Sequence, residues 1–210
     1  MTFNEWYDCI KKIPPIDLEW NPWGFPARGD RNRTGECADE SGLLPILEYF
    51  ASQCETITEF GCREGHSTSA FLVGLSKNNN SVRQKLISVD MRTTGGGYER
   101  LQQMNDLPCA WEFILRDTIS GDWQINKTDM LHIDTLHTYD QVQKELEIHG
   151  NQAQKYLSFH DVISQGKQSL DMPGQEGICR AIEEYTNKNG WKRILEINYN
   201  HGLWIYGKTQ

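Results

Sequence analysis

A chain of 210 residues is long enough for one domain with a substantial core. Its net charge of -8 disfavours general binding to DNA or RNA, because phosphate backbones repel an acidic protein. With 38% hydrophobic and 24% charged residues the composition is that of a folded protein, and no apolar stretch is long enough to cross a bilayer.

The N-terminal stretch MTFNEWYDCIKK has polar and acidic residues where a secretory signal has a basic start and an apolar run. We therefore expect a cytoplasmic protein. The six cysteines include no C-x-x-C pair, which predicts reduced, mostly buried thiols rather than a zinc or redox site.

Residues 1–35 carry four of the seven prolines and three of the seven tryptophans, without helical or strand periodicity. Proline restricts the backbone and removes a donor, so this segment is predicted to be an irregular arm that anchors on the core by its aromatic rings. A lid over an active site is the alternative. The basic cluster Arg28, Arg31 and Arg33 is interpreted as a solvated loop, with a clamp for an anionic group as the other reading.

From about residue 40, apolar runs of strand length alternate with amphipathic stretches. A helix is predicted over 41–52, whose apolar residues fall on one helical stripe. The predicted strands cover 56–61, 85–91, 111–117, 129–134 and 156–162. Helical stretches follow the first, second and fourth of these strands, at 67–77, 98–105 and 139–149. This alternation is typical of βαβ units in a parallel sheet.

The C-terminal part has a different pattern. A helix over 177–190 is followed by strands at 193–199 and 202–208, which are joined too closely for a crossover and therefore form an antiparallel hairpin. The sequence predicts an α/β fold with a single domain over residues 36–210. Its sheet has seven strands, is mostly parallel and ends in a C-terminal antiparallel β-hairpin.

In open α/β sheets, ligands bind at the carboxyl ends of the strands. The first predicted strand ends in EFGCREGHST, with Glu59, Gly61 and Gly65 before Ser67, which opens a helix. Glycines allow a sharp turn and a close approach to a ligand, and the helix N-terminus at Ser67, a candidate cofactor-binding residue, offers free backbone donors. Taken alone the pattern is weak, because G-x-x-x-G also occurs in loops that bind nothing.

The second and third predicted strands also end in acids. Asp90 can accept hydrogen bonds from ribose hydroxyls, and Asp117 is a candidate partner for an adenine amine. For each acid taken alone, a helix cap or a solvated turn is the alternative. The succession of acids at neighbouring strand ends favours a nucleoside site.

ITEFGCREGHSTSAFL resembles motif I of class I S-adenosylmethionine-dependent methyltransferases, in the form E-x-G-x-x-x-G-x-S-T, and Asp90 matches the acid of the second motif. IDTLHTYDQVQKELE followed by YLSFHDV is similar to the branch with macrolide-sugar O-methyltransferases and cephalosporin-hydroxylase-like proteins. The resemblance covers roughly residues 40–165. This chain has Thr135 and NQAQK where many relatives have a glycine and a Gly-Gly turn.

The resemblance implies a Rossmann-like class I methyltransferase fold. It implies that Glu59, Gly61 and Gly65 hold the methionine and sugar parts of S-adenosylmethionine, and that Asp90 holds its ribose. The activity expected from it is an O-methyltransferase that modifies a hydroxyl of a small molecule, such as a sugar or a natural product.

Asp134 ends the fourth predicted strand, and His160 with Asp161 ends the fifth. Adjacent parallel strands bring these groups to one spot beside the cofactor. Two carboxylates and an imidazole suit a divalent cation, with Mg²⁺ favoured by the oxygens and Mn²⁺ by the histidine. Some members of the resembled branch bind a metal there. A metal lowers the pKa of a hydroxyl and orients its oxygen towards the methyl group.

His137 lies three residues after Asp134 and is a candidate general base, because a neutral imidazole with a pKa near 6.5 suits neutral pH. The alternative is a helix-start residue that bonds only to backbone. His132 and His149 are predicted to pack in the core, and His201 is predicted to be solvated in the hairpin turn. His66 is a candidate to line the cofactor site.

The glycine-rich stretch 92–100 is a candidate to close over the site, with Tyr98 stacked on a substrate ring; a plain surface loop is the alternative. A cofactor-binding protein without turnover remains open, as does a nicotinamide-dependent oxidoreductase, although GCREGHS lacks G-x-G-x-x-G. The expected partner is a small hydroxylated molecule. A homo-oligomer is compatible with the sequence, and neither membrane nor nucleic acid is expected.

Overall fold

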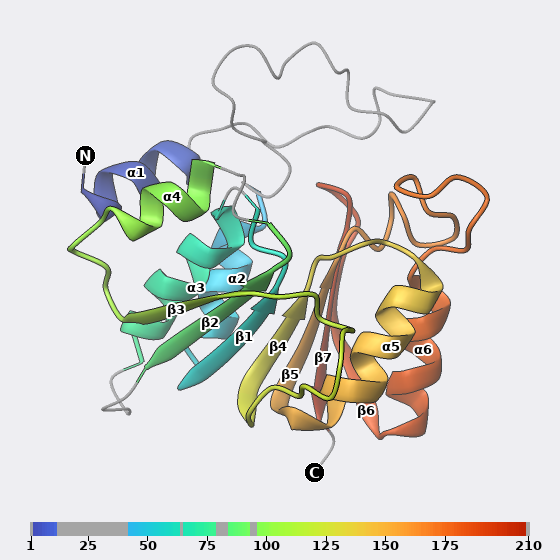
Figure 1. Cartoon of the computed structure of the whole chain (residues 1–210). Coiled ribbons are helices and arrows are strands. Elements are labelled where there is room, and N and C mark those ends of the chain that lie inside the picture. Colours follow the sequence, from blue (N-terminus) through green and yellow to red (C-terminus); the bar gives the residue numbers. More distant parts are fainter. Residues whose placement is uncertain (1, 12–41, 64, 79–83, 93–95, 209–210) are drawn as a thin grey trace.

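The computed structural model describes residues 2–11, 42–63, 65–78, 84–92 and 96–208, which form one twisted sheet with helices on both faces (Figure 1). The strands are β1 Thr56–Phe60, β2 Lys85–Asp90, β3 Ala110–Leu115, β4 Thr128–Ile133, β5 Ala153–His160, β6 Trp191–Ile197 and β7 Leu203–Lys208. Their order across the sheet is β3-β2-β1-β4-β5-β7-β6. The first five strands are parallel, and β7 is antiparallel to both β5 and β6.

Six helices and a 3-10 turn are described: α1 Phe3–Lys11, α2 Leu44–Ala51, α3 His66–Ser76, α4 Gly96–Gln102, α5 Tyr139–His149, η3 Gly150–Gln152 and α6 Cys179–Lys188. Residues of α1, α2 and α3 share a core cluster with Ile57 and Met130, whereas α5 and α6 share another with Phe60 and Leu131. Because successive strand residues point to opposite faces, these are the two faces of the sheet. The fold is therefore a three-layer α/β sandwich.

The predicted α/β fold with seven strands and a terminal hairpin is confirmed. The prediction of an irregular N-terminal arm is wrong for Phe3–Lys11, which form α1. Phe3, Trp6 and Tyr7 lie at helical spacing and are buried in the α1–α3 core cluster. Trp20, Trp23 and the three arginines of the basic cluster lie outside the described residues, so the arm-or-lid division at residue 35 stays a prediction.

The topology gathers the functional candidates at one edge of the sheet. The carboxyl ends of β1 to β5 meet there, because those strands are parallel. The antiparallel β7 begins opposite the end of β5, where Leu203 pairs with His160. The hairpin turn at 198–202 therefore reaches the same edge.

Cys9, Cys54, Cys109 and Cys179 are free thiols, as predicted, but among the described cysteines only Cys54 and Cys62 are buried, so the prediction of mostly buried thiols is wrong for the others. Burial raises the pKa of the Cys54 thiol to about 12, which keeps it protonated and unreactive. No helix in the described ranges is long and apolar enough to span a membrane.

Candidate active site

The loop after β1 turns sharply beneath the carboxyl edge. Gly61 and Gly65 both have left-handed backbones, with φ of 81° and 78°. A Cβ added at Gly61 would lie 1.9 Å from the carbonyl oxygen of Asp134, so no other residue fits there. Gly65 immediately precedes α3. The loop thus turns sharply and leads to a helix N-terminus, as its glycine pattern predicted, and at Gly61 it packs directly against the end of β4.

Glu59 lies under this loop and is fully buried. Its carboxylate accepts hydrogen bonds from the hydroxyls of Ser67 at 2.5 Å, Thr68 at 2.8 Å and Ser88 at 2.6 Å. Burial raises the pKa of Glu59 to about 7, although the three hydroxyl donors oppose that shift. Glu59 and Ser67, both predicted to bind the cofactor, contact each other and fasten the start of α3 to β1 and β2.

The acids at the end of β2 and just after β3 take part in backbone turns at the same edge. Asp90 Oδ2 accepts from the N–H groups of Cys62, at 3.0 Å, and Arg63, at 3.2 Å, so this acid holds the glycine loop in place. Asp117 lies two residues beyond β3, and its Oδ1 accepts from the N–H of Ile119 at 3.0 Å. Both acids lie at the strand ends, where the sequence suggested a nucleoside site. Each also accepts from backbone N–H groups of a turn, which was the alternative interpretation of these residues.

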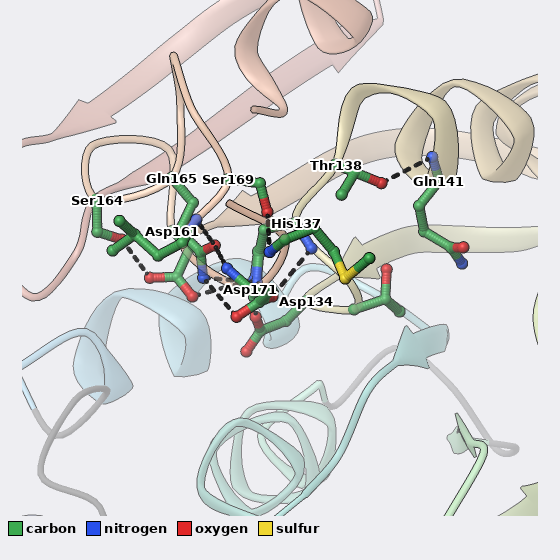
Figure 2. A network of polar contacts seen from close by, with 12 residues as sticks. Asp134, His137, Thr138, Gln141, Asp161, Ser164, Gln165, Ser169 and Asp171 are labelled. Atoms are coloured by element: carbon green, nitrogen blue, oxygen red, sulfur yellow. Dashed lines mark hydrogen bonds and ion pairs between the residues drawn. The ribbon is translucent and has the colours of Figure 1, made fainter. Parts of the chain in front are cut away.

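Asp134 and Asp161 converge, as their positions at the ends of β4 and β5 predicted (Figure 2). His137 Nε2 lies 3.0 Å from Asp134 Oδ1 and 3.0 Å from Asp161 Oδ2. Asp161 has a left-handed backbone with φ of 62°, which is costly for a side chain with a Cβ. Ser164 Oγ donates to Asp161 Oδ1 at 2.7 Å and helps to hold this conformation.

His160 approaches the same two carboxylates from β5. Its Nδ1 lies 3.4 Å from Asp134 Oδ2 and 4.0 Å from Asp161 Oδ2, and its Nε2 donates to the carbonyl of Asn200 at 3.0 Å. This bond to the hairpin turn directs Nδ1 towards the carboxylates. Asp134, His160 and Asp161, the predicted metal ligands, are therefore brought together.

The tightest group of ligand atoms contains the other imidazole. One ligand atom each of Asp134, His137 and Asp161 lie within 4.8 Å of one another. Both candidate sets share the two aspartates, and the donors in each are carboxylate oxygens and imidazole nitrogens. Such a donor set fits Mg²⁺ less well than Mn²⁺, which accepts nitrogen readily.

Charges at this edge shift several pKa values. Although burial alone would raise the pKa of Asp134, the neighbouring His160 and His137 hold it well below its usual range. Burial alone would lower the pKa of His137, but its bonds to Asp134, Asp161 and Asp171 raise it well above 6.5. These carboxylates therefore favour the protonated imidazolium form of His137.

The sequence did not point to Asp171 or Gln165. Asp171 Oδ2 lies 2.6 Å from His137 Nδ1, and Gln165 Nε2 lies 2.8 Å from the same nitrogen (Figure 2). Both residues belong to the irregular segment between β5 and α6, which has neither periodicity nor a strand end to mark it. The hairpin carbonyl of Asn200 was missed for a similar reason, since a backbone group leaves no trace in the residue type.

The other histidines divide between confirmed and wrong predictions. His132 and His149 are fully buried, as predicted. His149 Nε2 donates to the carbonyl of Thr118 at 2.7 Å, which joins α5 to the loop after β3. His201 was predicted to be solvated, which is wrong: it is only 6% exposed, because the hairpin turn folds over the end of β5. His66 is buried at the start of α3, and its cofactor role stays a prediction.

A second polar network lies beside the first. Glu145, fully buried on α5, accepts from the hydroxyls of Thr118 and Thr135 and from the amide of Gln141. Thr118 follows β3 and Thr135 follows β4, so one carboxylate joins the two loops. Thr135, which departs from the glycine of many relatives, has this contact.

A family model described as a methyltransferase domain matches residues 58–162, half of the chain. The chain belongs to this family. The match runs from β1 to the residue after Asp161, so it contains the glycine loop and both converging aspartates. The protein is an S-adenosylmethionine-dependent methyltransferase of class I, consistent with its strand order. No curated protein matches the sequence of this methyltransferase.

Solved structures with the same fold include a protein from Staphylococcus aureus assigned as a caffeoyl-CoA O-methyltransferase, with a TM-score of 0.57 and 13% identity over 99% of this chain and 90% of that one. Another is the methyltransferase PaMTH1 of Podospora anserina bound to S-adenosylhomocysteine, with a TM-score of 0.56 and 12% identity over 99% of this chain and 94% of that one. A third is the N-methyltransferase NodS of Bradyrhizobium japonicum WM9, with a TM-score of 0.54 and 12% identity over 80% of this chain and 94% of that one.

Proposed function

We propose that this methyltransferase transfers the methyl group of S-adenosylmethionine to a hydroxyl oxygen of a small molecule, such as a sugar or a natural product, with the help of a divalent cation. The fold alone does not choose the acceptor atom, because O- and N-methyltransferases both resemble this structure. The observation that carries the proposal is the convergence of Asp134, His137 and Asp161 beside the glycine loop.

The cofactor site is proposed at the ends of β1, β2 and β3. Gly61 and Gly65 adopt the left-handed backbones of the turn that leads into α3, and the N-terminus of α3 offers backbone donors to the methionine carboxylate. Asp90 and Asp117 are proposed to bind ribose and adenine. Glu59 and Ser67 support this site from below, because their side chains bond to each other.

The cation site is proposed at Asp134, His160 and Asp161. Their fit rests on the donor set, since two half-buried carboxylates and an imidazole nitrogen converge from the ends of β4 and β5. The bond from His160 to Asn200 orients the ring in the way that metal-binding histidines usually are. A bound divalent cation would lower the pKa of an acceptor hydroxyl.

His137 is proposed as the general base. It lies just before α5, whose first turn is capped by Thr138 accepting from the N–H of Gln141 at 3.3 Å. This placement directs Nε2 to the space between the two aspartates. With the charges of those carboxylates neutralised by a bound cation, His137 Nε2 would no longer be held protonated by them and would be able to accept the hydroxyl proton.

Three exposed apolar side chains adjoin this centre in sequence: Leu136 precedes His137, and Leu170 and Met172 flank Asp171. They favour an acceptor with an apolar part next to the modified hydroxyl. Nicotinamide chemistry has no comparable support, because the loop after β1 lacks G-x-G-x-x-G.

Calorimetry with S-adenosylhomocysteine tests the cofactor site. We expect saturable binding and an increase in melting temperature; no heat and no stabilisation at millimolar ligand would refute the proposal.

Calorimetry with MnCl₂ tests the cation site and separates the two histidines. We expect Asp134→Ala to abolish binding, His160→Gln to weaken it at least about tenfold, and His137→Gln to leave it within about threefold of wild type. If His137→Gln is the variant that loses Mn²⁺, His137 is a metal ligand and its assignment as the base is wrong.

A further inference from the structure

Asp171 reaches His137 across 34 residues of sequence and contacts it twice. Its Oδ2 lies 2.6 Å from the ring nitrogen Nδ1 and accepts from the backbone N–H of His137 at 3.2 Å. The two contacts fix both the ring and the main chain of His137 relative to the same oxygen.

The buried side chain of Gln165 holds the backbone of the segment that carries Asp171. Gln165 is only 7% exposed, and its Oε1 accepts from the N–H groups of Leu170, at 3.0 Å, and Asp171, at 3.2 Å. The base of the segment is closed by Gly177, where a Cβ would lie 1.9 Å from the carbonyl oxygen of Gln165. The position of the Asp171 carboxylate is therefore set by a packed loop rather than by an exposed side chain alone.

Two groups compete for His137 Nδ1. Because Gln165 Oε1 is engaged by backbone N–H groups, its amide nitrogen is the end that faces Nδ1, at 2.8 Å. If Gln165 donated, Nδ1 would be unprotonated and its lone pair would lie 2.6 Å from the Asp171 carboxylate, which is repulsive. A proton on Nδ1 gives instead a charge-assisted bond, the stronger of the two interactions.

We propose that Asp171 is a positioning residue for His137, which keeps a proton on Nδ1 and thereby presents Nε2, the nitrogen facing Asp134 and Asp161, as the atom that accepts a proton from the substrate. This inference rests on the proposed function, where His137 is the base. The same division of labour, with a carboxylate that orients an imidazole through Nδ1, operates in hydrolytic triads.

The arrangement makes Gln165 the residue that takes over when Asp171 is removed. Without the carboxylate, the Gln165 amide donates to Nδ1, and the proton of a neutral ring moves to Nε2. The ring would then have the wrong nitrogen protonated for accepting a proton, while the loop keeps its bonds from Gln165 Oε1 to the backbone.

The test is the Nδ1 proton of His137, observed by NMR in protein labelled with ¹⁵N-histidine and loaded with Mg²⁺ and S-adenosylhomocysteine. We expect a downfield, slowly exchanging Nδ1 proton in the wild type, assigned by its absence in His137→Gln. Asp171→Leu, which keeps the approximate size of the side chain but has no acceptor, should lose it, and Lys167→Ala, an exposed position in the same segment, should retain it. An Nδ1 proton that persists unchanged in Asp171→Leu would overturn the proposal.

A kinetic readout separates positioning from folding. With any accepted hydroxyl substrate, Asp171→Leu should lower kcat by about 10- to 100-fold with S-adenosylhomocysteine affinity unchanged. A loss of affinity that matches the loss of kcat would instead assign Asp171 a purely structural role. If the wild type shows the Nδ1 proton but does not bind S-adenosylhomocysteine, the proposed function fails while the Asp171–His137 pair stands.

Discussion

Glu59→Gln should change how the stability of the protein depends on pH. The Glu59 carboxyl has an ordinary pKa of 4.5, and burial raises the pKa to about 7 in the folded state. Between these values the unfolded chain releases the proton and the folded protein keeps it. Stability is therefore lost as the pH rises from 4.5 to 7. At about 1.4 kcal/mol for each pH unit, this difference corresponds to about 3 kcal/mol.

Glutamine stays neutral over this range, and its amide can both accept from and donate to the three surrounding hydroxyls. The free energy of unfolding of Glu59→Gln minus that of the wild type should therefore increase by about 3 kcal/mol from pH 5 to pH 8. Urea unfolding followed by tryptophan fluorescence measures it.

The exposed Glu55→Gln serves as the control, because it changes the same residue type just before β1. Other groups that titrate in this window, among them Glu145, are common to both proteins and cancel in the difference. A difference that stays flat across the range would show that Glu59 is ionised when folded, and the reasoning from burial would be wrong.

Three further changes test the packing of the site. Gly61→Ala should unfold more readily by several kcal/mol and lose S-adenosylhomocysteine binding, because its Cβ meets Asp134; a normal melting temperature would contradict this. Glu145→Ala leaves three hydrogen-bond donors without their acceptor and should lower the free energy of unfolding by on the order of 3 kcal/mol, whereas the exposed Glu147→Ala should change it little. His149→Leu leaves the Thr118 carbonyl and the Ile125 N–H without a partner and should lower it by about 2 kcal/mol in urea unfolding, whereas a neutral effect would show that water replaces the ring.

The alternation of apolar runs of strand length with amphipathic stretches, and the close spacing of the last two strands, were enough to predict the sheet, because each run is a local feature of the sequence. The helix α1 was missed although Phe3, Trp6 and Tyr7 have helical spacing. Composition over residues 1–35, with its prolines further along the chain, concealed nine residues of regular structure. A compositional argument averages over a window and loses an element shorter than that window.

For the site, position at strand ends predicted Asp134, His160 and Asp161 because parallel strands bring such residues together whatever the loops do. The direction in which each side chain points could not be predicted in the same way. Glu59 ends a strand too, but it faces α3 and bonds to hydroxyls in the core. Asp171 depends on how an irregular segment folds back, which only long-range packing decides.

Gly61 links the proposed cofactor site to the proposed cation site. Its N–H donates to the carbonyl of Val89 on β2, and its α-carbon lies against the backbone of Asp134 after β4. The glycine that turns the cofactor loop is thus also the contact surface for the residue that would hold the cation. Since interiors packed this tightly do not deform gradually, a displacement of the loop must displace Asp134 as well. In the proposed mechanism, the spacing between the methyl donor and the acceptor hydroxyl would therefore depend on this backbone contact between the residues that follow β1 and β4.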